Sequence, residues 1–107
     1  MKVFLGNAFS LQMITTELTN GAVSVQITPV TKEEVATSNF TSVVGHVDTA
    51  AVLSDMLGVE VPFNRANVAI GKCDTLFVAQ VVGGRLPEGA TTLPAGFELT
   101  FLKVELL

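Results

Sequence analysis

The feature that most constrains the fold of this chain is a nearly continuous apolar stretch over residues 75–82, which ends at two glycines. Only Thr75 and Gln80 interrupt it, and the remaining residues are Leu, Phe, Val and Ala. A short apolar run that is rich in β-branched and aromatic residues and bounded by glycines is typical of a buried strand. We therefore predict that residues 75–82 form the central strand of a sheet.

Other segments have weaker strand patterns. Residues 3–5 are apolar and are closed by a glycine and an asparagine, which predicts a strand buried on both faces. Residues 21–27 alternate between apolar and polar, and residues 97–106 alternate over their whole length, as in a strand with one solvated face. Residues 67–70 are a candidate for a short edge strand.

Two short helices are expected before the middle of the chain. Thr31 and Glu34 have the spacing of a capping box, in which a hydroxyl and a carboxylate each accept from a free amide of the first turn. A helix of about two turns should follow and end near Asn39. Ser10 is a candidate cap for a helix over residues 11–16, although its β-branched residues weaken that prediction.

A longer helix is predicted over residues 49–57, opened by Asp48 and stopped by Gly58. With 107 residues the chain has the size of one domain, residues 1–107. Strands and helices alternate along it. The predicted fold class is therefore α/β, with a mixed sheet of about five strands flanked by short helices.

Composition narrows the function. Ten acidic and six basic residues give a net charge of −4, which argues against coating duplex nucleic acid by bulk electrostatics. An anionic ligand would need a local site. One cysteine, Cys73, and one histidine provide neither an intrachain disulfide nor a zinc quartet, so we expect a reducing cytoplasm and no metal or cofactor. No run approaches the ~18 apolar residues of a membrane helix, so we expect a soluble protein that is not secreted.

Polar residues cluster where two predicted strands end. Asn7 and Ser10 follow the first strand, and Arg85 and Glu88 follow the central one. Ligands bind beyond the carboxyl ends of parallel strands, so we expect the two loops to be neighbours. Gly84 lets a ligand approach the backbone, and the planar fork of Arg85 matches a phosphate. The pattern predicts an anion site.

Each of these residues also has an ordinary structural interpretation. His46, before the longer helix, is either a catalyst or a cap, and Arg85 and Glu88 are either a site or a surface ion pair. Asn7 and Ser10 are equally well explained as caps, and Arg65 as a solvated charge. No phosphate-binding loop, dinucleotide fingerprint, nucleophile elbow or metal-ligand spacing occurs.

The order of four short motifs adds a resemblance that covers essentially the whole chain. Residues 3–10, the Gly-His pair at 45–46, the Asn-Arg pair at 64–65 and the loop at 85–89 resemble the viral ring nucleases. These type III anti-CRISPR proteins come from archaeal viruses and have phage and bacterial relatives. The resemblance implies an α/β homodimer that cleaves cyclic tetra-adenylate to linear adenylates without a metal, in the host cytoplasm if the protein is viral.

By position, the resemblance implies catalytic roles for His46, Arg85 and Glu88, and substrate contacts for Asn7, Ser10, Arg65 and Gly84. His46 would act as the acid, and Glu88 as an orienting group or a base. One departure is visible, because residues 91–96 are too short and broken for the longer helix that family members often have there. Two other functions stay open: a non-catalytic regulator or sponge that binds a nucleotide or nucleic acid, and a structural interaction protein.

Overall fold

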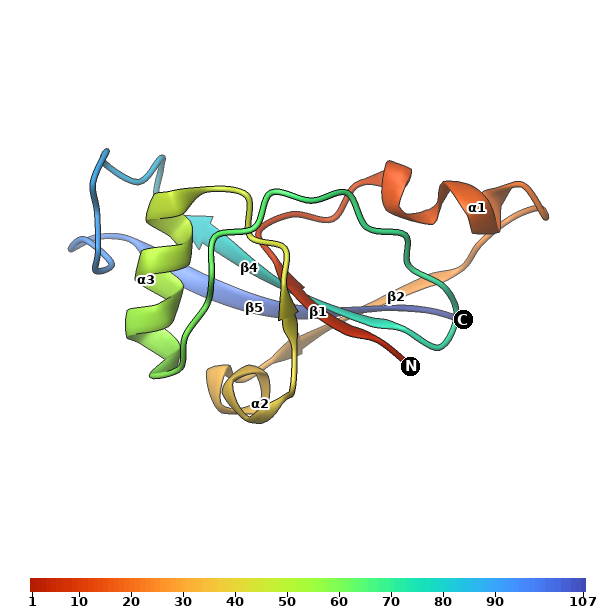
Figure 1. Ribbon diagram of the computed structural model, residues 1–107, viewed down its shortest axis with the longest axis horizontal. Helices are drawn as coiled ribbons and strands as arrows, with labels where there is room; N and C mark the ends of the chain where they lie inside the picture. Colours follow the sequence, from red (N-terminus) through yellow and green to blue (C-terminus); the bar gives the residue numbers. More distant parts are fainter.

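The computed structural model describes residues 1–107 and contains one mixed five-stranded sheet, in the order β2-β5-β4-β1-β3 (Figure 1). β4 lies at the centre, as the apolar stretch predicts. It is parallel to β1 and antiparallel to β5. The α/β class with about five strands is confirmed. The strands are β1 Val3–Gly6, β2 Val25–Val30, β3 Thr41–Ser42, β4 Thr75–Val82 and β5 Glu98–Leu106.

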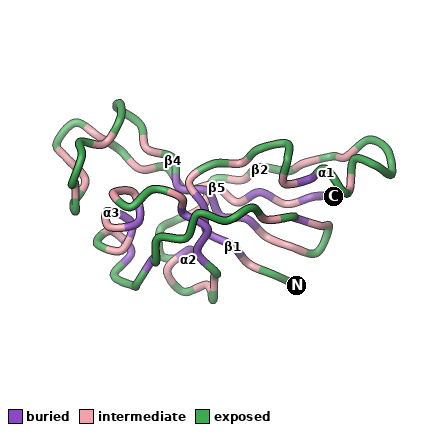
Figure 2. The backbone as a smooth tube through the Cα atoms, turned by 45° about the horizontal axis from the view of Figure 1, so that its top comes forward, coloured by how far each residue is buried: buried purple, intermediate pink, exposed green.

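Successive side chains of β1 and β4 point to opposite faces of the sheet, and an apolar core covers each face. Leu5 and Phe77 pack into one core with buried residues of α2 (Lys32–Thr37) and α3 (Val47–Leu57). Phe4 and Leu76 pack into a second core, to which η1 (Leu11–Ile14) contributes Ile14. The helix α1 (Thr15–Leu18) follows η1 directly and has no buried residue. Figure 2 shows the buried stretches gathered where β1, β4 and β5 run side by side.

The two capped helices form where predicted, with one difference in each. α3 stops at Gly58, which adopts the left-handed conformation with φ 69°, but it begins at Val47 with His46 at the N-cap position. α2 begins after Thr31, whose hydroxyl accepts from the Glu34 amide at 3.2 Å. The second half of the predicted capping box, in which the Glu34 carboxylate accepts from the Thr31 amide, does not form.

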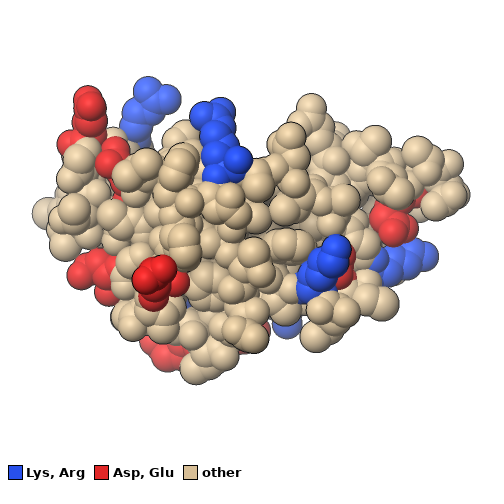
Figure 3. Space-filling model, in the orientation of Figure 1, with Lys and Arg blue, Asp and Glu red and all other residues tan.

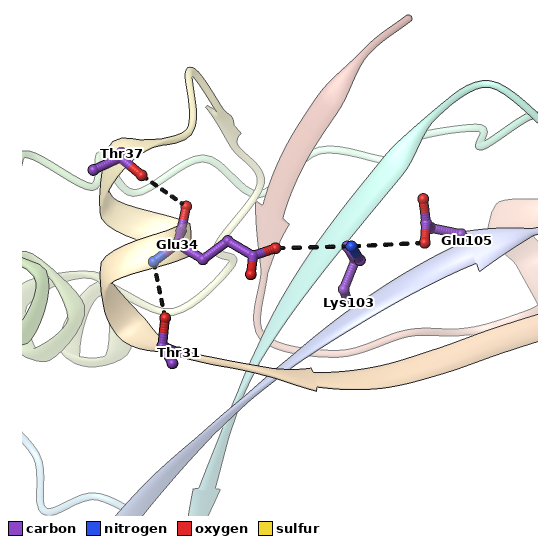
Figure 4. A network of polar contacts seen from close by, with 5 residues as sticks. All are labelled: Thr31, Glu34, Thr37, Lys103 and Glu105. Atoms are coloured by element: carbon purple, nitrogen blue, oxygen red, sulfur yellow. Dashed lines mark hydrogen bonds and ion pairs between the residues drawn. The ribbon is translucent and has the colours of Figure 1, made fainter.

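Lys103 explains that missing half. The Glu34 carboxylate lies 3.8 Å from the ammonium of Lys103 on β5, as Figure 4 shows, and Lys103 also lies 3.9 Å from Glu105. The carboxylate is directed at the sheet and does not turn back to the Thr31 amide. A tertiary contact therefore replaces the local one, and α2 ends at Thr37, before the predicted Asn39.

Three further expectations need correction. Residues 67–70 form no strand; Ile70 is buried and its amide donates to the Met13 carbonyl, so this loop covers the second core. β2 begins at Val25, not at residue 21, because its partner β5 ends at Leu106. Ser10 occupies the N-cap position of η1, but its side chain makes no capping hydrogen bond.

Parallel pairing of β1 with β4 brings their carboxyl ends to the same edge of the sheet. Gly6, the last residue of β1, lies opposite Val78, and β4 continues beyond it to Val82. The loops that follow both strands therefore leave from one region, next to the N-terminal end of α3. No helix is long and apolar enough to cross a membrane.

Candidate functional site

A cavity of about 530 Å³ opens at this edge of the sheet. Three segments line it: the loop after β1, the first turn of α3, and the end of β4 with the loop that follows. The predicted proximity of the two strand-end loops is therefore observed. The lining residues are Asn7, His46, Asp48, Thr49, Ala79, Gln80, Val81, Gly84, Arg85 and Leu86.

A larger cavity, of about 630 Å³, lies beside the edge strand β3. Its lining is mostly apolar, amide and hydroxyl groups, with Glu60 as its one ionisable side chain. The smaller cavity contains a histidine, an aspartate and an arginine, so it is the one with several ionisable side chains.

His46 stands at the start of α3 without capping it. Its backbone is extended, its side chain is exposed, and no side chain accepts from the first-turn amides of the helix. The Gly45 amide donates to Oδ1 of Asn7 at 3.2 Å, which ties the residue before His46 to the loop after β1. An uncapped helix N-terminus carries partial positive charge and free N–H groups, so this end of α3 favours an anion.

Arg85 carries an unpaired charge. It follows Gly83 and Gly84, which have φ of 120° and 131°, values that side chains other than glycine rarely tolerate. A Cβ at Gly83 would lie 2.9 Å from the Gly96 carbonyl oxygen, so the turn needs glycine. The salt bridges of the protein all involve Lys103, so no carboxylate, Glu88 included, neutralises Arg85.

Three residues implied by the resemblance lie outside the cavity. Glu88 is exposed on the loop that carries Arg85. Ser10 lines a separate cavity of about 250 Å³, beside Asn67. Arg65 packs over the residue before His46, since a Cβ on Gly45 would lie 3.4 Å from its Cγ. The structure thus brings His46 together with Asn7, Gly84 and Arg85, but not with Glu88, Ser10 or Arg65.

Two polar groups of the cavity wall, Gln80 and Asp48, are not predicted from the sequence as site residues. Gln80 is the polar interruption of the apolar stretch, and that interruption was the available signal. Asp48 was predicted only to open a helix, although it lines the cavity.

Figure 3 shows basic side chains standing above the N-terminal end of α3 and the loop after β4, with acidic side chains beside them. No group of three His, Cys, Asp or Glu side chains is placed to hold a metal ion.

An apolar cavity of about 300 Å³ shares two lining residues, Asn7 and Gln80, with this site. It is otherwise lined by Ala8, Phe9, Ile27, Val78, Leu102 and Val104. Val78 and Val104 belong to the second core, whereas Ala79 in the wall of the His46 cavity belongs to the first, so the two cavities open on opposite faces of the sheet.

The fold and the cavity define a small α/β protein with a cavity that contains a histidine, an arginine and an aspartate at the carboxyl edge of a mixed sheet. The family model described as STIV B116-like matches residues 3–103, and the chain belongs to this family. Among solved structures, the chain is similar to B116 of Sulfolobus turreted icosahedral virus, with a TM-score of 0.77 and 21% identity. The alignment covers 98% of this chain and 99% of that chain, and it shows the shared fold. No match was found among the curated proteins.

Proposed function

We propose that the protein is a metal-independent ring nuclease that cleaves cyclic tetra-adenylate and so antagonises type III CRISPR immunity. One observation carries the proposal: His46 and the unpaired Arg85 line one cavity at the uncapped N-terminal end of α3. The resemblance of the strand-end motifs to viral ring nucleases supports the choice of substrate.

The reaction is a transesterification within the RNA backbone. The 2′-hydroxyl of one nucleotide attacks the adjacent phosphorus, the bond to the 5′-oxygen breaks, and a 2′,3′-cyclic phosphate and a 5′-hydroxyl result. Arg85 would stabilise the charge that develops on the phosphoryl oxygens, an effect worth several kcal/mol in a dry site. His46 in its imidazolium form would donate the proton that the 5′-oxygen requires. The proton of the 2′-hydroxyl passes to water or to Glu88.

Glu88 has the less direct role in this scheme. Glu88 is exposed, does not line the cavity and forms no ion pair with Arg85. Ser10 and Arg65 would contact the outer parts of a bound ring.

The size of the cavity supports a homodimer. A volume of about 530 Å³ lies within the range of roughly 300–1,000 Å³ that suits one drug-sized ligand, and a ring of four nucleotides is larger than such a ligand. Two cavities related by a two-fold axis would accommodate the ring symmetrically. Two chains of net charge −4 bring −8 together, so affinity depends on enclosure and direct contacts, not on long-range attraction.

The decisive experiment incubates the purified protein with labelled cyclic tetra-adenylate in EDTA. We expect linear adenylates. His46→Ala should keep binding but lose roughly 100- to 10,000-fold in single-turnover cleavage, because an acid acts on the leaving group. Asn39→Ala, at the distant β3 cavity, is the control and should cleave normally. A His46→Ala variant that binds weakly yet cleaves at the normal rate would refute this role.

The position of Glu88 favours a second candidate, a nucleotide-binding sponge. Asp48 is the only carboxylate in the cavity wall, and its Oδ1 accepts from the Gly89 amide, so a cavity with His46 and Arg85 but without Glu88 is suited to sequestration. Binding of cyclic tetra-adenylate without conversion would support that function. A protein that binds no nucleotide would be left with a purely structural role.

A further inference from the structure

The loop that carries Arg85 and Glu88 is joined to the rest of the protein by a single hydrogen bond outside its two ends. This loop, residues 83–97, joins β4 to β5 beyond the pair formed by Val82 and Glu98. Two of its hydrogen bonds are internal, Ala90 to Pro87 and Phe97 to Pro94. The only hydrogen bond that leaves the loop runs from the Gly89 amide to Oδ1 of Asp48, at 3.2 Å.

Asp48 is well placed to hold the loop in a fixed position relative to α3. It lies in the first turn of α3, two residues after His46, and α3 is anchored by the buried Ala50 and Leu53. At the other end of the bond, Gly89 directly follows Glu88 and has a positive φ of 80°, which favours glycine. The carboxylate thus links a rigid helix to a glycine-containing turn beside the proposed catalytic groups.

Stabilisation of α3 alone does not explain why a charged Asp48 lies in the cavity wall. A carboxylate in the wall of an anion-binding cavity repels the ligand, so its presence there is a cost unless it does something else. It also complements the positive end of the α3 dipole, as any acid in a first turn would. The contact with Gly89 is the property that distinguishes Asp48 from such an acid.

We propose that Asp48 is the positioning residue of this site, and that its hydrogen bond to Gly89 sets the location of Arg85 and Glu88 relative to His46. The part of this inference that concerns cleavage rests on the proposed function. The part that concerns the loop does not, because it can be tested without a nucleotide.

The substrate-free test follows the Gly89 amide and the Arg85–Leu86 bond. In Asp48→Ala we expect Gly89 to lose its protection from hydrogen exchange, and trypsin to cut after Arg85 several-fold faster. Asp48→Asn keeps a side-chain oxygen that accepts from Gly89, so it should behave like the wild type. Asp55→Ala removes an exposed acid from the same helix and is the control. If Asp48→Ala leaves both measurements unchanged, the loop is held by something else and the proposal is wrong.

The second test separates positioning from helix stability. With cyclic tetra-adenylate, Asp48→Ala should lower the maximal cleavage rate by roughly 10- to 100-fold, the scale expected of a misplaced catalytic group. Asp48→Asn should restore the rate, whereas a dipole effect would make the Ala and Asn variants equal and would contradict the proposal. If the wild type does not cleave the ring but Gly89 still depends on Asp48, the proposed function fails and the attachment stands. Normal cleavage by Asp48→Ala would refute the positioning role alone.

Discussion

Arg65 and Arg85 are the only two arginines of the chain, and their surroundings differ. Arg85 lines the cavity and follows two glycines, whereas Arg65 packs its aliphatic stem over Gly45 and lies outside the cavity wall. A guanidinium that faces the ligand contributes to binding much more than one whose stem covers a neighbouring turn.

We therefore predict that cyclic tetra-adenylate raises the melting temperature, and that Arg85→Ala removes most of the rise. A ligand at one hundred times Kd stabilises the folded state by about 2.7 kcal/mol. Arg65→Ala should keep most of the shift in the same thermal-denaturation series. The reverse result, with Arg65 essential and Arg85 dispensable, would place the binding site elsewhere.

Asp74 is the residue at which a pH dependence is expected. The pKa of its carboxyl lies below the ordinary value of 3.8, chiefly because the Gly71 amide donates to it; the Lys2 amide and charge act in the same direction, and partial burial opposes them. The Asp74 carboxylate accepts hydrogen bonds from the Gly71 amide at 2.9 Å and from the Lys2 amide at 3.0 Å. These two hydrogen bonds tie the turn before β4 to the start of β1.

A lowered folded-state pKa means that the charged carboxylate stabilises the fold. This stabilisation is complete above the unfolded-state pKa and is lost as pH falls through the folded-state pKa. We expect Asp74→Ala to cost about 1 kcal/mol at pH 7 and almost nothing near pH 2, measured by urea unfolding across that range. An equal difference at both pH values would show that the carboxylate charge is unimportant.

The site could be predicted from the sequence only in part. Residues directly at strand or helix ends, such as Asn7 and His46, are placed by the fold itself. Glu88 and Ser10 are further along their loops, where side-chain direction depends on turns that a linear pattern does not encode. Asp48 was missed as a site residue because its partner Gly89 is 41 residues away.

At the scale of elements, strong hydrophobic patterns predicted the central strand and the long helix, whereas a weak pattern predicted a strand that does not form. Residues 75–82 and the α3 helix with its Gly58 stop were predictable because hydrophobic burial and backbone sterics act locally there. The two-residue β3 has no pattern to detect, since its pairing with β1 alone defines it. Residues 67–70 have an apolar pattern because they cover a core as a loop.

The ends of α2 give a prediction about capping. Thr31→Ala removes the hydroxyl that accepts from the Glu34 amide and should cost about 1 kcal/mol. Glu34→Ala should cost less than about 0.5 kcal/mol, because its carboxylate forms only a long, partly exposed ion pair with Lys103. Urea unfolding of both variants decides the matter. Equal losses would mean that the full capping box exists in solution.

At the scale of the whole molecule, the proposed dimer has a defined stoichiometry. Calorimetric titration of the His46→Ala variant with cyclic tetra-adenylate should end at one ring for every two chains, because each chain supplies half of the enclosure. Sedimentation should give twice the chain mass of 11.3 kDa. One ring per chain at the monomer mass would contradict the two-fold arrangement and leave a single cavity to hold the ligand.

The strand order also determines when the sheet can form during synthesis. β1 lies inside the sheet, yet its long partner β4 begins 72 residues after the start of β1. β2 pairs only with β5, the last strand along the chain. The first half of the nascent chain therefore leaves the ribosome with apolar strands that have almost nothing to pair with. Sheets dominated by such distant pairings fold slowly, on the order of milliseconds to seconds. Until β4 and β5 have been made, the native sheet cannot protect these strands from aggregation.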